Sequence, residues 1–262
     1  MARHAAGRHP TCEPGHAEKA SALPWLVLIP GTLCDRRLFA AQARALRGQT
    51  RIRCVDLHGL RDDVSAWAER LLRQLPPHFS LGGFSLGGLL ALELLRQAPE
   101  RIERLALVAS NAEPASRRAQ RRSRQQRTAW RDGGAEAVVD RLMPVYLPVR
   151  RQRARHAQLI HRMAGATPDT AARAQFAWAA LRPSGHAAMA AHATPLLVVS
   201  GADDALCPRT QQQRLLATRP DARWLELRRC GHFIPLERPR QLSRLLAQWL
   251  AAPPRGVSGD PA

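Results

Sequence analysis

Short apolar runs recur along most of the chain and alternate with segments whose apolar residues follow helical spacing. Runs that are apolar at nearly every position are typical of strands buried on both faces of a parallel sheet. The segments between them have the amphipathic pattern of helices that cover such a sheet. The six runs that predict strands span residues 25–30, 51–57, 79–84, 104–110, 195–201 and 222–228.

Three segments predict helices that pack on this sheet, at residues 64–75, 85–98 and 239–250. Strands that alternate with helices are joined by crossover connections, which make neighbouring strands parallel. The pattern therefore predicts an α/β fold with a mostly parallel sheet flanked by helices.

Residues 112–194 interrupt this alternation, because they contain several helical patterns and no convincing strand. We predict that they form an all-helical lid (cap) over the carboxyl edge of the sheet, where ligands bind in open α/β folds. The core then comprises residues 23–111 and 195–251. Glycine, proline and polar residues dominate 1–22 and 252–262, which we predict to be poorly ordered tails.

A single serine stands between glycines where a predicted strand meets a predicted helix. The sequence Gly83-Phe84-Ser85-Leu86-Gly87 has the form G-x-S-x-G. In a nucleophile elbow this spacing lets strand and helix pass close together while the serine hydroxyl projects from the sheet. The context therefore favours Ser85 as a nucleophile over a simple tight turn.

A serine hydroxyl needs a base to accept its proton and an acid to orient that base. Asp203 and Asp204 follow the strand at 195–201, and His232 follows the strand at 222–228. Taken singly, the acids are typical turn residues and the histidine is typical of a structural role. The order serine, acid, histidine, with each residue after a strand, favours a catalytic triad.

Hydrolysis through a serine also requires donors for the oxyanion of the intermediate. The backbone N–H of Leu86, directly after the serine, supplies the first. The loop after the first strand bends at Gly31, which makes the N–H of Thr32 the expected second donor and that of Leu33 the alternative.

Five stretches between residues 24 and 250 together resemble the α/β-hydrolase superfamily. The resemblance implies the α/β-hydrolase fold and the chemistry of its esterases, lactonases, or carbon–carbon bond hydrolases and lyases. A serine at the elbow differs from the aspartate of haloalkane dehalogenases and epoxide hydrolases. The stretches are "LIPGTLCD", "VDLHG", "GFSLGG", "PLLVVSGADDALCP" and "CGHFIPLERP".

The family's patterns select between the candidate residues. In its Gly-x-x-Asp-x-x-x-Pro pattern the acid is the fourth residue, which is Asp204 here. The pair Gly231-His232, followed by Glu237 and Pro239, matches the family's histidine loop. Many members carry His-Gly in the oxyanion loop, whereas this chain has Pro-Gly, so the geometry of that loop is the part the resemblance fixes least.

We therefore predict a hydrolase that cleaves a small carboxylic ester, lactone or related carbonyl compound through an acyl-enzyme. The predicted catalytic residues are Ser85, Asp204 and His232. Two alternatives are a lyase or carbon–carbon bond hydrolase acting on a carboxylate-bearing substrate, and a non-catalytic binding module on the same fold. The oligomeric state is left open.

Substrate contacts have weaker signals within the predicted lid. Arg182 resembles the arginine with which some lactonase-like and lyase-like relatives hold a carboxylate, although an exposed arginine is the simpler interpretation. Trp178 and Phe176 could line an apolar acyl site or pack inside the lid.

The net charge of +19 comes from arginine, since Lys19 is the only lysine. The sequence has no module typical of nucleic-acid binding, so nucleic acid is an unlikely partner. The arginine-rich run at 117–131 has the composition of a solvated helix face; contact with an anionic substrate or polymer is the alternative.

Cofactor and metal motifs are not found in the sequence: there is no P-loop, no G-x-G-x-x-G and no H-E-x-x-H. His156 and His161 are five residues apart, which places them on different helix faces. A signal peptide and an apolar stretch of membrane-spanning length are also missing, so we expect a cytoplasmic protein without cofactor. The odd, scattered cysteines suggest neither disulfides nor a zinc site; they are Cys12, Cys34, Cys54, Cys207 and Cys230.

Overall fold

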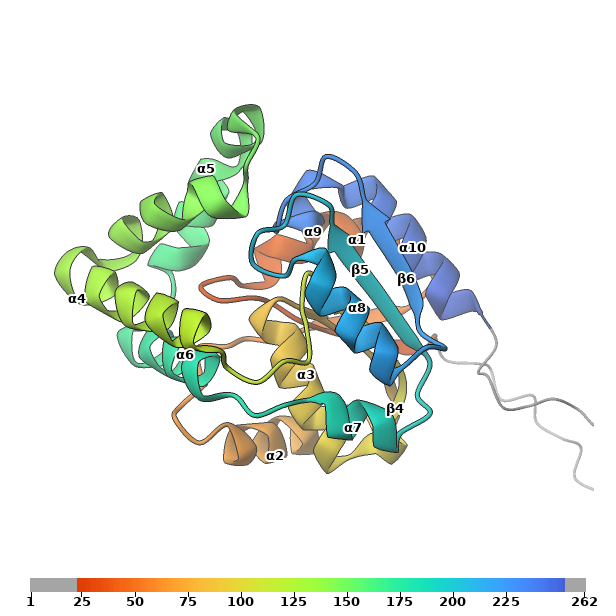
Figure 1. Cartoon of the computed structure of the whole chain (residues 1–262). Helices are drawn as coiled ribbons and strands as arrows, with labels where there is room; N and C mark the ends of the chain where they lie inside the picture. The colour runs from red at the N-terminus through yellow and green to blue at the C-terminus, as the bar shows by residue number, and fades with distance from the viewer. Residues whose placement is uncertain (1–22, 253–262) are drawn as a thin grey trace, which may run out of the picture.

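The computed structural model describes residues 23–252, and the predicted tails lie outside this range except for Ala252. Its centre is a six-stranded sheet in the order β2-β1-β3-β4-β5-β6 (Figure 1). All five strand pairings are parallel, which confirms the predicted fold class. The strands are β1 (Trp25–Ile29), β2 (Arg51–Cys54), β3 (Phe79–Phe84), β4 (Ile102–Val108), β5 (Leu196–Gly201) and β6 (Arg223–Leu227).

Each strand begins within two residues of the start of the apolar run that predicted it. The most completely buried strands lie inside the sheet. Every residue of β3 and β5 is buried, as expected of strands covered on both faces. The edge strand β2 has no buried residue, since it pairs with one neighbour only. The hydrophobic core therefore centres on the strands that lead to Ser85 and Asp204.

Helices cover the two faces of the sheet. On one face, α2 (Val64–Gln74), α3 (Leu86–Gln97) and α7 (His186–Ala191) bury side chains that include Trp67, Leu90 and Met189. On the other face, α10 (Pro239–Ala251) packs against α1 (Ala40–Ala45) and buries Leu242 and Trp249. The remaining elements of these layers are α8 (Arg209–Thr218), α9 (Ile234–Glu237) and the short 3-10 helices η1 (Arg36–Phe39) and η2 (Pro99–Arg101).

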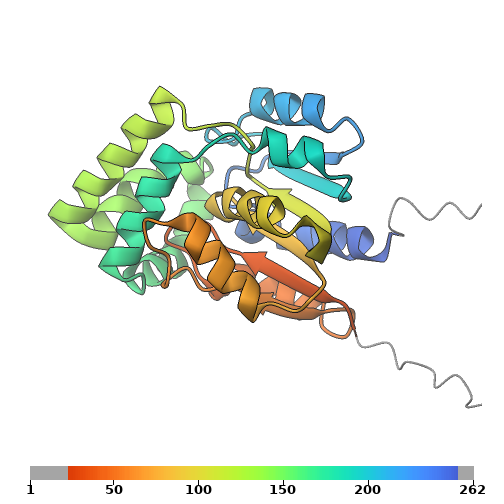
Figure 2. The same cartoon turned by 90° about the horizontal axis from the view of Figure 1, so that it is seen from below.

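The segment between β4 and β5 consists of four helices and no strand within the described chain. Three of them, α4 (Arg117–Tyr146), α5 (Arg150–Gly165) and α6 (Asp169–Leu181), lie together beyond the carboxyl ends of the strands (Figures 1 and 2). We call these three helices the α4–α6 insertion. The fourth helix, α7, packs on α3 as part of the sheet's helical layer, because Met189 is fully buried there.

Helix α4 is interrupted near its middle by a pair of glycines. Gly133 has φ −148° and ψ 18°, and Gly134 has φ 62° and ψ −150°, so neither continues the helix. The left-handed φ of Gly134 is one that glycine adopts without steric cost. The first half of α4 carries the arginine-rich run, and the second half buries Val138, Val139 and Met143.

Close packing around the turn between β3 and α3 explains its glycines. A Cβ atom on Gly83 would overlap the backbone of Gly87 and Gly88, and one on Gly87 would overlap the carbonyl oxygen of Ile29. Strand β3 and helix α3 therefore approach each other and β1 to distances that only glycine allows. The turn is therefore packed against the backbone of both β1 and the first turn of α3.

None of the described helices combines the length and the apolar composition that crossing a membrane requires.

A Gly87→Ala variant tests this packing. Because the overlapping atom belongs to the backbone of β1, the variant must shift a central strand, and we expect a loss of about 1–3 kcal/mol or more in the free energy of unfolding. Gly165→Ala is the matched control, since no heavy atom lies within 4 Å of its added Cβ. Urea unfolding of both variants gives the comparison; equal stabilities would contradict the close approach.

Candidate active site

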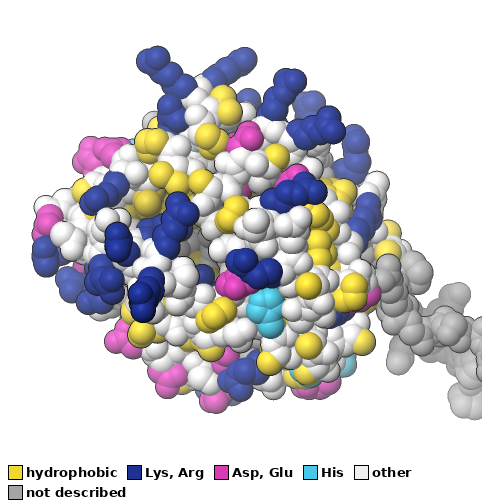
Figure 3. Space-filling view, in the orientation of Figure 1, with side chains coloured by type: hydrophobic (Ala, Val, Ile, Leu, Met, Phe, Trp, Pro, Cys, Tyr) yellow, Lys and Arg dark blue, Asp and Glu magenta, His cyan; other side chains and the backbone are white. Residues whose placement is uncertain are grey.

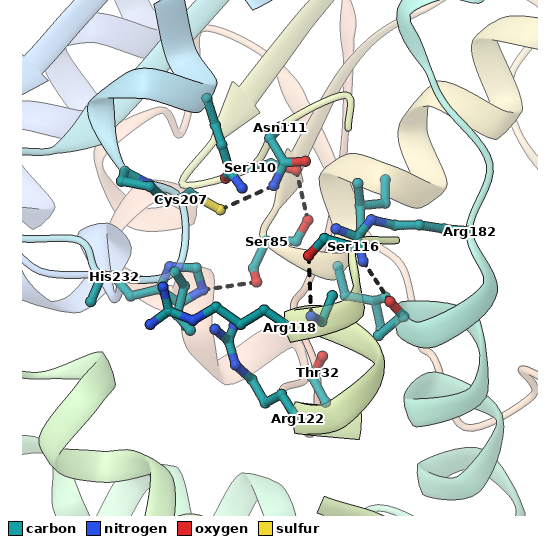
Figure 4. Close-up of a pocket in the computed structure, with 18 of the residues that line it drawn as sticks. Thr32, Ser85, Ser110, Asn111, Ser116, Arg118, Arg122, Arg182, Cys207 and His232 are labelled. Carbon is teal, nitrogen blue, oxygen red and sulfur yellow. Dashed lines mark hydrogen bonds between the residues drawn. The ribbon is translucent and has the colours of Figure 1, made fainter. Parts of the chain in front are cut away.

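Three residues that are far apart in the sequence meet where strands end. Ser85 follows β3, Asp204 follows β5, and His232 follows β6. Since the strands are parallel, their carboxyl ends form one edge of the sheet, and the loops beyond them face the same space. Figure 4 shows Ser85 and His232 at the cavity beneath the α4–α6 insertion.

The three side chains form one chain of hydrogen bonds. His232 Nε2 lies 2.8 Å from Ser85 Oγ, and His232 Nδ1 lies 2.8 Å from Asp204 Oδ2. An ionised carboxylate only accepts hydrogen bonds, so Nδ1 carries the proton and Nε2 is free to accept from the serine hydroxyl. This is the arrangement in which a histidine can act as a base toward serine.

Asp204 is buried, and its carboxylate takes part in three hydrogen bonds. Its Oδ1 accepts hydrogen bonds from the N–H groups of Leu206, at 2.8 Å, and Cys207, at 3.1 Å. Burial acts to raise the pKa of Asp204, but the charge and hydrogen bond of His232 and the two backbone N–H groups together hold it below its ordinary value. The carboxyl group is therefore ionised at neutral pH, as orientation of the imidazole requires.

The other candidate acid lies elsewhere. Asp203 is exposed, and its backbone N–H donates to the carbonyl of Cys230 at 2.9 Å. It is Asp204, the fourth residue of the Gly-x-x-Asp pattern, that reaches His232.

Ser85 has an unusual backbone, with φ 52° and ψ −116°. Its N–H donates to the carbonyl of Val108 at 2.9 Å, and its carbonyl accepts from the Ser110 hydroxyl at 2.8 Å. Left-handed φ values are rare for residues other than glycine and persist only where the surroundings enforce them. Here β4 and the start of α3 enforce the conformation that points the hydroxyl toward His232.

The predicted oxyanion donors lie on both sides of Ser85. Leu86 is the first residue of α3, so its N–H has no acceptor within the helix. Thr32 lines the same cavity as Ser85, from the loop after β1. The N–H of Leu33, the alternative donor, is already bonded to the side-chain oxygen of Gln175 at 2.8 Å. Of the two candidate donors in this loop, only the N–H of Leu33 is thus occupied by another group of the described residues.

Gln175 is a site residue that the sequence did not indicate. It belongs to α6, is 1% exposed, and reaches from the insertion to the loop after β1. Leu33 has a left-handed φ of 55°, so the loop needs an acceptor in this position to hold its shape. A glutamine inside an alanine-rich helical pattern carries no signal of such a role.

Tyr146 joins the insertion to the histidine loop. Its backbone carbonyl accepts from the N–H of His232 at 2.9 Å, and the two rings lie 5.2 Å apart. The C-terminal end of α4 therefore fixes the backbone that carries the imidazole.

The cavity at Ser85 has a volume of about 140 Å³ and a mainly polar lining. Three arginines line it, Arg118 and Arg122 from α4 and Arg182 after α6. An adjoining apolar recess of about 20 Å³ shares Thr32 and Tyr146 with it. A recess of this volume holds about one water-sized group, such as a methyl group.

The other predicted substrate contacts lie at different places around the site. Arg182 lines the cavity, and its side chain donates to the backbone carbonyls of Glu113 and Ala179. Trp178 lines a recess of about 40 Å³ beside α3, which shares Leu89 and Arg182 with the lining of the Ser85 cavity, so its contact with substrate stays a prediction. Phe176 is fully buried and packs edge-on against Trp130 inside the insertion.

Cys207 is a second potential nucleophile in the cavity lining, and it forms with Asp204 and His232 a cluster of metal-ligating types. Burial, followed by the charge of Asp204, raises the pKa of its thiol to about 12, so it stays protonated. The Nδ1 atom of His232 and the Oδ2 atom of Asp204 form a hydrogen bond with each other. His232 thus has both ring nitrogens within hydrogen-bond distance of other side chains, Nδ1 of Asp204 and Nε2 of Ser85.

Residues 26–245 match the model of the alpha/beta hydrolase family. This covers most of the chain, and the protein belongs to that family. The family expected from the sequence motifs is confirmed.

Curated relatives that match the chain include two esterases with the same description, pimeloyl-[acyl-carrier protein] methyl ester esterase. The protein of Aromatoleum aromaticum is 26% identical over 85% of this chain and 96% of its own length. That of Nitrosomonas europaea is 34% identical over 36% of this chain and 40% of its own length. The match thus spans nearly all of the Aromatoleum protein and less than half of the Nitrosomonas protein.

Solved structures show the same fold. The enol-lactonase from Burkholderia xenovorans has a TM-score of 0.76 at 21% identity, over 90% of this chain and 94% of that chain. A thermophilic esterase from Thermogutta terrifontis has a TM-score of 0.73 at 22% identity, over 87% and 89% respectively. The predicted type of enzyme, an ester hydrolase of this fold, agrees with these neighbours.

Replacing Gln175 tests its contact with the oxyanion loop. Gln175→Ala leaves the buried Leu33 N–H without an acceptor, at a cost of about 1–3 kcal/mol in the free energy of unfolding. Amide hydrogen exchange at Leu33 should quicken, and Gln175→Glu, which keeps an acceptor in place, should restore the protection of that amide. Gln158→Ala, at an exposed position of α5, is the control. Unchanged exchange at Leu33 in Gln175→Ala would rule out the contact.

Proposed function

We propose that this protein hydrolyses carboxylic esters through an acyl-enzyme, with Ser85 as the nucleophile, His232 as the base and Asp204 as the group that orients the base. The observation that carries this proposal is the hydrogen-bond chain from Ser85 to Asp204, with both distances at 2.8 Å, at the lining of a cavity. Membership of the alpha/beta hydrolase family and its esterase relatives support it.

The reaction has two halves. The Ser85 oxygen attacks the ester carbonyl while its proton passes to His232 Nε2; the same proton then goes to the departing alcohol. A water molecule next gives a proton to Nε2, attacks the acyl carbonyl and releases the carboxylic acid, and the proton returns to Ser85. In each half Asp204 stabilises the imidazolium while it carries the extra proton.

The oxyanion of each tetrahedral intermediate accepts hydrogen bonds from the N–H groups of Leu86 and Thr32. Both belong to residues that line the cavity beside Ser85. Removal of one such donor in a well-studied serine protease costs about 2.7–4 kcal/mol in the barrier. The α4–α6 insertion covers the edge of the sheet where these steps occur and acts as the lid.

A more specific candidate is the methyl ester of an acyl group attached to an acyl carrier protein, which is the substrate in the descriptions of the curated relatives. The surface charge supports it. Dark-blue side chains project over α4 and α5 in Figure 3, and they are arginines because the single lysine lies outside the described residues. Such a surface attracts an acidic carrier.

Labelling with a fluorophosphonate tests the nucleophile. We expect one adduct per molecule, located on Ser85 by peptide mass spectrometry and absent from His232→Ala. Ser85→Ala should lower kcat toward a p-nitrophenyl ester by on the order of 10⁶-fold. Ser184→Ala, at an exposed loop position, should retain labelling and turnover. Full turnover by folded Ser85→Ala would refute the proposal.

Comparison of pimeloyl-[acyl carrier protein] methyl ester with monomethyl pimelate tests the carrier. At low salt the carrier-bound ester should have at least about tenfold higher kcat/KM, and the advantage should shrink as salt screens the arginines. Equal values for the two esters at every salt concentration would exclude recognition of the carrier.

A further inference from the structure

Arginines are the charged side chains that line the Ser85 cavity, so its lining carries positive charge. Arg118, Arg122 and Arg182 line it, and no aspartate or glutamate side chain is among its lining residues. The carboxylate of Asp204 lies behind His232, buried and occupied by hydrogen bonds. Three guanidinium groups that share a small space repel one another unless an anion lies between them.

Arg118, which is exposed, and Arg122, which is half-buried, both line the cavity without a partner among the described residues. Neither forms a hydrogen bond or an ion pair with any residue from 23 to 252. By contrast, the half-buried Arg37 pairs with Asp35 at 2.5 Å, and the buried Arg219 pairs with Asp221 at 2.8 Å. The two cavity arginines thus keep their full set of donors for a ligand.

Their positions on α4 direct both side chains into the cavity. They are four residues apart, which places them on the same face of the helix. In Figure 4 both extend toward His232, while Arg182 lies on the other side of Ser85. The first turn of α4 also presents its N-terminus to the cavity, since Ser116 and Ala119 belong to the lining. Backbone N–H groups there add to the positive potential.

The electrostatics of neighbouring groups reflect this potential. Burial, and further the charge of Arg122, hold the pKa of Arg182 below its ordinary value. The guanidinium of Arg122 also acts to lower the pKa of Tyr146 against a larger upward effect of burial. The charge of Arg122 therefore reaches both ends of the cavity.

We propose that Arg118 and Arg122 bind an anionic oxyacid group of the substrate, a carboxylate or a phosphate, so that the enzyme selects esters carrying a second, ionised group. This rests on the proposed function, because the same cavity holds Ser85. Guanidinium groups bind such oxygens through paired, charge-assisted hydrogen bonds. The apolar recess beside Thr32 takes the small group at the other end of the molecule, which favours methyl esters.

The test uses monomethyl esters of succinate, glutarate, adipate and pimelate, each paired with the neutral ester in which a carboxamide replaces the free carboxylate. At the best chain length the acid should have at least about tenfold higher kcat/KM than its amide. In Arg118→Gln/Arg122→Gln this ratio should fall toward one. Methyl esters with a terminal phosphonate show whether phosphate or carboxylate fits better.

Arg124→Gln is the matched control, because it removes the same charge from an exposed position of α4 outside the cavity lining. Its acid-to-amide ratio should equal that of the unchanged protein. A ratio near one for every pair in the unchanged protein, or an equal fall in Arg124→Gln, would overturn the proposal while Ser85-dependent hydrolysis stands.

Binding separates this inference from the proposed function. Calorimetry with Ser85→Ala and monomethyl adipate should give a dissociation constant that rises at least about tenfold when Arg118 and Arg122 are also replaced. If no ester is cleaved but this loss of binding is observed, the anion site stands and the hydrolase proposal fails. Binding unaffected by the arginine substitutions would overturn the anion site.

Discussion

Ser85 joins β3 to α3 with a left-handed backbone, a conformation that costs a residue with a side chain roughly 1–3 kcal/mol. The cost is offset by bonds to Val108 and Ser110 and by packing of the whole turn against β1. Glycines at positions 83 and 87 are what allows that packing. The direction of the serine hydroxyl, and with it the 2.8 Å contact to His232, depends on this one strained junction.

Burial sets the protonation states around that junction. The thiol of Cys207 is kept neutral, whereas Asp204 is kept ionised by donors that outweigh its burial. The thiol is therefore a poor nucleophile, whereas the Ser85 hydroxyl has a base within hydrogen-bond distance, which supports the proposed role of Ser85. The positive charge of the arginines lies at the lining of the cavity, whereas the negative charge of Asp204 lies on the Nδ1 side of His232, away from Ser85.

Much of the fold could be predicted from the sequence, because buried parallel strands are apolar at every position and glycine spacing marks the elbow. Helices α1 and α8 were missed, since α1 is short and alanine-rich and polar residues dominate α8. Gln42 and Gln212 are fully buried there and donate to backbone carbonyls, a role that hydrophobic periodicity does not reveal.

The site residues likewise fall into those that the sequence indicated and those that only the fold reveals. The order of Ser85, Asp204 and His232 along the chain indicated which residues belong together, but their distances needed the fold. Arg118 and Arg122 lie in a run whose composition is that of a solvated helix, and only the placement of α4 distinguishes them from Arg124. Trp178 lies in the recess beside α3 that adjoins the Ser85 cavity, a position that helical periodicity alone does not distinguish from the inside of the insertion.

Two contacts of the α4–α6 insertion bear on how a substrate enters. Gln175 holds the loop of Thr32 and Leu33, and the carbonyl of Tyr146 holds the N–H of His232. If the insertion moves away from the sheet to admit an ester, both hydrogen bonds break. The loop of Thr32 and Leu33 and the loop of His232 then each lose a group that fixes the backbone. The shape of both loops thus depends on the position of a segment that is far from them in the sequence.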